Sequence, residues 1–154
     1  MKKLKALYIE DQPDNIEVFG DLFRKNDFEI YTIQPLPSDI NQYYKYILKE
    51  EIDFIIIDNE LKRQVTYTGL DVLKEIRKQD NNIFIVLLTS YDYDEYVDEL
   101  GELDYAIKKQ DFTIDAARNL SKKIKRAYQR GEEIKINNQI DEEIQKLTKK
   151  LNDN

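Results

Sequence analysis

Residues 52–58 read IDFIIID, a run of β-branched and aromatic residues that stops at a carboxylate, Asp58. The run is nearly continuous rather than alternating, which indicates a strand covered on both faces. Other short apolar runs complete the set of expected strands: residues 4–9, 28–33, 83–88 and, more weakly, 103–107. The chain is therefore expected to contain five strands.

Helical patterns follow each of these runs. Pro13 suits the first turn of one helix, because its missing N–H has no partner there in any case, and Ser38 is a candidate N-cap for the next. Further patterns lie at about residues 69–78 and 92–100, and a fifth begins at Asp111. Strands that alternate with helices predict an α/β fold, with a parallel sheet, right-handed crossovers and helices on both faces.

The amino-acid composition limits the kinds of catalytic and metal-binding site that the chain can form. The 154 residues fit one domain with an appendage, and they contain neither cysteine nor histidine. This excludes disulfides, thiolate metal sites and histidine general bases. The net charge of −7 argues against direct binding to nucleic acid. We find no stretch long enough to cross a membrane and no signal peptide, and we expect a cytoplasmic protein.

Polar side chains stand where the expected strands end. The acidic pair Glu10 and Asp11 follows the first strand, Asp58 follows the third, Thr89 follows the fourth and Lys108 ends the fifth. The carboxyl ends of parallel strands meet at one edge of a sheet, where such folds place their sites. Three carboxylates packed together must bind either protons or a cation. Oxygen ligands are what Mg²⁺ prefers.

Taken in order, these segments resemble the receiver domain family of two-component response regulators over residues 4–130. The matching segments are the acidic pair at 10–11, DFIIID at 53–58, GLDVL at 69–73, FIVLLTS at 84–90 and DYAIK at 104–108. The resemblance implies a flavodoxin-like, doubly wound five-stranded parallel sheet in the order 2-1-3-4-5. It also implies a phosphoacceptor signalling domain rather than an enzyme with turnover on other substrates.

The resemblance implies a role for each site residue. Asp58 accepts the phosphoryl group from a sensor histidine kinase or a phosphotransfer protein. Mg²⁺ is held by Asp11 and Asp58, with Glu10 beside them and the backbone carbonyl of Glu60 as a further ligand. Lys108 is the cation that contacts the phosphoryl oxygens.

Two residues are expected to carry the switch. The hydroxyl of Thr89 bonds the phosphate, and Tyr105 turns inward in response. The face made by the fourth helix, fifth strand and fifth helix then presents the change to a downstream protein, whose identity the sequence does not give. We also expect Glu60 and Tyr91, which flank the site, to gate water and tune dephosphorylation.

The chain departs from the family at two places. Lys109 stands where the family usually has a proline, and a cis bond before a non-proline residue costs about 2.5–4 kcal/mol, so we expect a trans bond there. The segment 59–68 is longer than the usual loop. It includes Lys62, Arg63 and Tyr67, which could contact a partner or the phosphate.

Residues 131–154 are expected to form a polar helical tail after a domain at residues 1–130, because Gly131 interrupts the pattern of the fifth helix. Apolar residues in the tail alternate four, three and four apart, as in a coiled-coil seam: Ile140, Ile144, Leu147 and Leu151. A homodimer could form through residues 132–154 or through the switch face. The tail could instead reach toward a partner or an output domain, or fray, since short isolated helices are marginal in water.

Two alternative functions remain open. A pseudo-receiver would bind a partner without phosphorylation, which the replacement by Lys109 and the long loop allow. A Mg²⁺-dependent phosphohydrolase or Toprim-like enzyme would use Asp58 and Glu60 as an acidic motif. The phosphohydrolase motif normally follows the first strand, however, and the Toprim alternative leaves Thr89 and Lys108 without roles.

Overall fold

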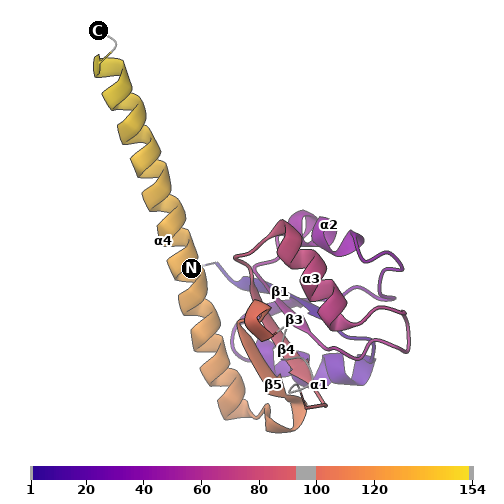
Figure 1. The fold of residues 1–154 in the computed structure, drawn as a ribbon. Helices are drawn as coiled ribbons and strands as arrows, with labels where there is room; N and C mark the ends of the chain where they lie inside the picture. Colours follow the sequence, from indigo (N-terminus) through magenta and orange to yellow (C-terminus); the bar gives the residue numbers. More distant parts are fainter. Residues whose placement is uncertain (1, 93–99, 153–154) are drawn as a thin grey trace.

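A computed structural model describes residues 2–92 and 100–152. Within them, one parallel sheet has five strands in the order β2-β1-β3-β4-β5, which confirms the predicted fold class (Figure 1). The strands are β1 (Leu4–Ile9), β2 (Phe28–Tyr31), β3 (Phe54–Ile57), β4 (Phe84–Thr89) and β5 (Tyr105–Lys108). The helices are α1 (Pro13–Arg24), α2 (Gln42–Lys49), α3 (Gly69–Gln79) and α4 (Ile114–Asn152), with short 3-10 turns η2 (Leu100–Glu102) and η3 (Lys109–Asp111).

Helices cover both faces of the sheet, so the core has two halves. Along β3, Ile55 and Ile57 belong to the half that packs against α2 and α3. Phe54 and Ile56 belong to the half that packs against α1 and the start of α4. Because successive strand residues point to opposite faces, a strand buried on both sides must be apolar at every position. This explains the unbroken apolar run at residues 54–57.

The register of the parallel strands aligns their carboxyl ends. Ile9 pairs with Ile57 across β1 and β3, and Ile57 pairs with Leu87 across β3 and β4. Thr89 pairs with Lys108 across β4 and β5. The polar residues that follow β1 and β3 therefore emerge at the same edge as the end of β4.

A half-buried arginine of α3, Arg77, anchors the strand that completes the sheet. The guanidinium of Arg77 donates hydrogen bonds to the Glu102 carbonyl (2.9 Å), the Ile83 carbonyl (2.8 Å) and the Asp104 carboxylate (3.0 Å). Asp104 also accepts a bond from the backbone N–H of Ile85, at 2.8 Å. Arg77 thus ties the residue before β5 to the residue before β4.

Two expected helix starts are wrong by a few residues. The second helix begins at Gln42 with Asn41 at its N-cap position, so Ser38 is not the cap. The fifth expected helix begins at Ile114, where the Thr113 hydroxyl accepts the Ala116 N–H at 3.2 Å, while Asp111 lies in η3. In each case an intervening turn, rather than the first polar residue, sets the start. The helix expected at 92–100 falls largely on residues 93–99, outside the described residues.

The last helix does not stop at its glycine. α4 is continuous from Ile114 to Asn152, so the interruption expected at Gly131 is wrong. A glycine in a helix interior costs only about 1 kcal/mol relative to alanine, which good helix formers on either side can offset. The buried residues of α4 end at Ile124, and its second half extends away from the body of the domain (Figure 1). The division into two parts at residue 130 stays a prediction.

Within residues 2–92 and 100–152, no helix combines the length and the apolar character needed to cross a bilayer.

Candidate functional site

Three carboxylates lie buried at the carboxyl edge of the sheet. Glu10 and Asp11 follow β1 and have 0% and 4% of their surface exposed, and Asp58 follows β3 with 3% exposed. The sheet ladder continues one residue past β3, because the Asp58 N–H donates to the Ile9 carbonyl at 3.0 Å. The backbone therefore fixes Asp58 beside the acidic pair.

The cation at this cluster is Lys109. Its Nζ lies 2.9 Å from Oδ2 of Asp58 and 3.0 Å from Oε2 of Glu10, and its side chain is only 8% exposed. The expected cation of this site was Lys108, but in this structure the Lys108 ammonium pairs with Asp92. Adjacent residues at a strand end point to opposite sides, and the η3 turn directs the second lysine toward Asp58. The sequence pattern favoured the lysine that ends the strand.

Burial and neighbouring charges shift the pKa values of Glu10 and Lys109. Burial, together with the hydrogen bond and negative charge of Asp58, raises the pKa of Glu10 to about 8, although Lys109 opposes the shift. For Lys109, burial alone would lower the pKa, but attraction to Asp58 and Glu10 outweighs it and the pKa is raised. The Lys109 ammonium therefore stays charged at neutral pH, and Glu10 binds its proton more tightly than an exposed glutamate does.

The oxygen atoms available here fit Mg²⁺. Oδ2 of Asp11 accepts the Arg63 N–H at 3.1 Å, whereas Oδ1 is buried and has no hydrogen-bond partner in the described part of the chain. A buried carboxylate oxygen without a partner is costly, and a hard cation would satisfy it. No group of three or more acidic side chains among the described residues already surrounds one cation position. The Lys109 ammonium lies between Glu10 and Asp58.

Two glutamines hold the backbone of the acidic pair. The Gln34 amide donates to the Glu10 carbonyl at 3.0 Å. The Gln64 amide donates to the Asp11 carbonyl at 3.0 Å and to the Gln34 side chain at 3.2 Å. The long loop after Asp58 thus supports Asp11 from outside the strand. Sequence reasoning missed both glutamines, because each sits in an irregular loop and matches no motif.

The same loop contains Tyr67, which we expected to be available to a partner or to the phosphate. Its hydroxyl bonds the Pro37 carbonyl at 2.5 Å and the Tyr43 hydroxyl at 2.6 Å, so it is already engaged within the domain. Lys62 and Arg63 are exposed. The backbone N–H of Arg63 donates a hydrogen bond to the Asp11 carboxylate. The loop is therefore fastened to the segment before α2.

The start of α3 packs directly against the backbone of Asp58. A Cβ at Gly69 would lie 2.1 Å from the Asp58 carbonyl oxygen, so only glycine fits. The Gly69 N–H donates to the Asn59 carbonyl at 3.0 Å, and the Leu70 N–H donates to the Asn59 side chain at 3.1 Å. Thr68 closes the helix start with a capping box. This contact explains the glycine at the start of the GLDVL segment.

The remaining expected residues lie around the site. Thr89 is fully buried at the end of β4, and its hydroxyl accepts the Tyr91 N–H at 3.3 Å. The Tyr91 side chain is exposed, and Glu60 is half-buried within 4.0 Å of Lys62. Tyr105 is half-buried in β5, with the Lys123 ammonium 5.9 Å from its ring centre. The Lys108–Lys109 bond is trans, as expected.

Comparisons with known proteins agree on one family. The model of the response regulator receiver domain matches residues 6–125. Sporulation initiation phosphotransferase F of Bacillus subtilis is 25% identical over 126 residues, which are 80% of this chain and 94% of that protein. The solved structure of response regulator protein TrrA from Thermotoga maritima, in complex with Mg²⁺-BeF, has a TM-score of 0.62 and 25% identity, covering 80% of this chain and 98% of that one.

TrrA has also been solved in complex with histidine kinase ThkA; that structure has a TM-score of 0.64 and 25% identity, covering 79% of this chain and 97% of the other. The family match, the strand order 2-1-3-4-5 and the acidic strand ends all agree. This chain belongs to the family of response regulator receiver domains, the signalling domains of two-component systems.

Proposed function

We propose that this receiver accepts a phosphoryl group on Asp58, with Mg²⁺ bound, from a histidine kinase or a phosphotransfer protein. The observation that carries the proposal is the position of Asp58. Its carboxylate is buried at the end of β3, bonded to Lys109 and next to the acidic pair Glu10 and Asp11. The phosphorylated form then switches a surface for a downstream protein.

The chemistry is transfer to a carboxylate oxygen. An oxygen of Asp58 attacks phosphorus, the bond from phosphorus to the donor nitrogen breaks, and the donor histidine keeps that electron pair and takes up a proton. Mg²⁺, when bound, neutralises charge on the phosphoryl oxygens. Asp11, Asp58 and the backbone carbonyl of Glu60 would hold it, with Glu10 beside them. The unpartnered Oδ1 of Asp11 supports this assignment.

Lys109 takes the role that the family pattern gives to the lysine at the end of β5, which is Lys108. Lys109 already bonds the Asp58 carboxylate at 2.9 Å, and an ammonium is a compact charge suited to phosphoryl oxygens. Lys108 is then a charge at the rim of the site, paired with Asp92. Lys109, rather than Lys108, points to Asp58 because the 3-10 turn η3 begins at Lys109, the position where the family usually has proline.

The switch begins at Thr89, whose hydroxyl donates its hydrogen to a phosphoryl oxygen while its oxygen remains able to accept the Tyr91 N–H. Tyr105 turns inward from β5, and the surface around β5 and α4 presents the change. Glu60 and Tyr91 at the rim control the access of water to the acyl phosphate. A coupling of about 1–3 kcal/mol would shift the two populations about 5- to 150-fold.

The comparisons support the partners and the metal. TrrA was solved with Mg²⁺-BeF and, separately, with a histidine kinase, and the curated relative is a sporulation phosphotransferase. The family match over residues 6–125 favours signalling over the phosphohydrolase and Toprim-like alternatives.

The direct test is incubation with Mg²⁺ and acetyl phosphate, followed by intact mass spectrometry. We expect one added phosphoryl group on the wild-type chain and none on Asp58→Asn or when Mg²⁺ is chelated. A wild-type chain that gains no mass, even from a cognate kinase, would indicate the pseudo-receiver alternative. A label that persists in Asp58→Asn would show that another residue is the acceptor.

A further inference from the structure

The second half of α4 has an exposed apolar stripe that the proposed function does not use. Ile134 is also exposed but lies on a different side of the helix; the stripe itself consists of five large apolar side chains that have between 51% and 76% of their surface exposed: Ile136, Ile140, Ile144, Leu147 and Leu151. At about 100° per residue, they fall within an arc of about 80° on the helix surface. If this part of the helix were surrounded by water, its apolar residues would have no reason to gather on one side.

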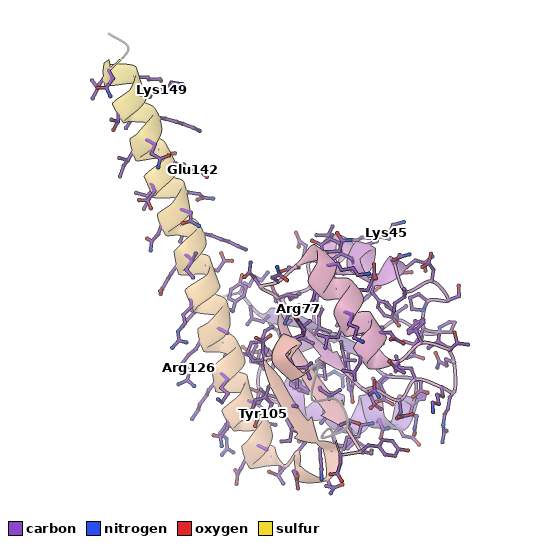
Figure 2. The ribbon with its side chains drawn as sticks, viewed as in Figure 1. Lys45, Arg77, Tyr105, Arg126, Glu142 and Lys149 are labelled. Carbon is purple, nitrogen blue, oxygen red and sulfur yellow. The ribbon has the colours of Figure 1, made fainter. Side chains whose placement is uncertain are left out.

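The stripe does not continue the face of α4 that packs on the domain. The buried residues of the first half include Leu120 and Ile124. Sixteen residues separate Ile124 from Ile140, which places them about 160° apart around the helix axis. The stripe therefore faces away from the side on which the domain lies. Glu142 and Lys149 lie on the part of α4 that stands clear of the body (Figure 2).

Charge along this segment is divided between its two ends. Three acidic residues come first, Asp141, Glu142 and Glu143, and three lysines follow, Lys146, Lys149 and Lys150. Two such helices side by side in the same direction would set like charges against like charges. In opposite directions, the acidic end of each would meet the basic end of the other.

The heptad positions make this complementarity specific. Ile140 and Leu147 occupy d positions, Ile144 and Leu151 occupy a positions, and Glu143 and Lys150 are both g positions. In an antiparallel pair, g residues of the two helices face each other, so each Glu143 would meet a Lys150. In a parallel pair, g faces e, and Glu143 would meet the uncharged Thr148.

We propose that α4 binds α4 of a second copy of this chain as an antiparallel coiled coil. Ile140 of one copy packs against Leu151 of the other, and Ile144 packs against Leu147, which gives four apolar layers. The two domains then lie at opposite ends of the pair, so both Asp58 sites stay open. With four layers the dimer is weak and depends on concentration. The proposal goes beyond the proposed function and does not require phosphorylation.

Sedimentation of the full chain over a range of concentrations tests the pairing. We expect dimers that Leu147→Asp abolishes, and the exposed position of Leu147 means that the domain still folds. Glu143→Lys should weaken the dimer by about tenfold, because it turns two attractive pairs into repulsive ones. The double variant Glu143→Lys/Lys150→Glu should restore it. Glu142→Lys makes the same charge change on the outer face and should leave dimerisation unchanged.

Disulfide trapping tests the direction, since the chain has no cysteine of its own. In the antiparallel pair the two copies of residue 140 lie about 16 Å apart along the axis, too far for a disulfide. A mixture of Ile140→Cys and Leu151→Cys should therefore crosslink, and Ile140→Cys alone should not. A crosslink of Ile140→Cys with itself, or a monomer at every concentration, would overturn the proposal. Phosphorylation of Asp58 is measured separately and does not affect either outcome.

Discussion

The ammonium of Lys109 lies 2.9 Å from the carboxylate of Asp58, although 51 residues separate the two in sequence. The neighbouring Lys108 pairs with Asp92 instead. The two adjacent lysines thus have the same chemistry but different positions, and each serves as the control for the other.

Lys109→Ala should slow phosphorylation of Asp58 by acetyl phosphate by about 10²-fold, because it removes the cation that would contact the phosphoryl oxygens. Lys108→Ala should stay within about twofold of wild type under the same conditions, since that side chain lies at the rim. The rates can be read by intact mass against time. A larger loss in Lys108→Ala than in Lys109→Ala would reverse the assignment.

Glu10 should make the stability of the metal-free protein depend on pH. Its folded pKa of about 8 lies above the ordinary value of 4.5, so the proton is bound more tightly in the folded state. The resulting stabilisation is fully present below about 4.5 and is lost as the pH rises through about 8. Glu10→Gln removes this contribution.

The measurement is urea unfolding of both proteins in EDTA between pH 6 and 9. The wild-type protein should lose stability relative to Glu10→Gln over this range. If the two pH profiles run parallel, the raised pKa of Glu10 is wrong.

Gly69→Ala should destabilise the domain by about 1–3 kcal/mol, because the new methyl group would lie 2.1 Å from the Asp58 carbonyl oxygen and force the backbone apart. Phosphorylation should fall as well, since Asp58 would move. The matched control is Gly131→Ala, where the methyl group meets no atom within 4 Å. That change should stabilise α4 by about 0.5–1 kcal/mol. Equal effects of the two substitutions in urea unfolding would contradict the close packing at Gly69.

Gln64→Ala should weaken Mg²⁺ binding, because it releases the Asp11 carbonyl and the Gln34 side chain together. We expect a stability loss of about 1 kcal/mol for the lost hydrogen bonds. Gln139→Ala, an exposed position on α4, provides the control. Titration calorimetry with Mg²⁺ measures the affinity, and an unchanged value would show that the loop does not position Asp11.

The fold was predictable because short stretches of sequence indicate its strands. Apolar runs that end in carboxylates mark buried parallel strands, and parallel strands bring those carboxylates to one edge, as Asp58 and Glu10 show. Which lysine contacts them was not predictable. Residues 108 and 109 have identical side chains, and the choice depends on the turn after β5. Gln34 and Gln64 act through irregular loops, for which no periodicity exists.

Two local sequence signals were misleading. Gly131 reads as a helix stop, but a single glycine costs too little to end α4. The sequence indicated Tyr67 only as a loop residue that could contact a partner or the phosphate, and its hydroxyl bonds both Pro37 and Tyr43. Partners distant in sequence decided both the loop and the site.

The uninterrupted path of α4 makes it a lever. Its 39 residues form a rod about 58 Å long, and all of its buried residues lie in the first third. A tilt of about 5° at that end would carry the free tip about 3 Å sideways, because some 32 Å of rod lies beyond Gly131. Small rearrangements beside β5 would thereby become large enough at the tip for a bound molecule to sense.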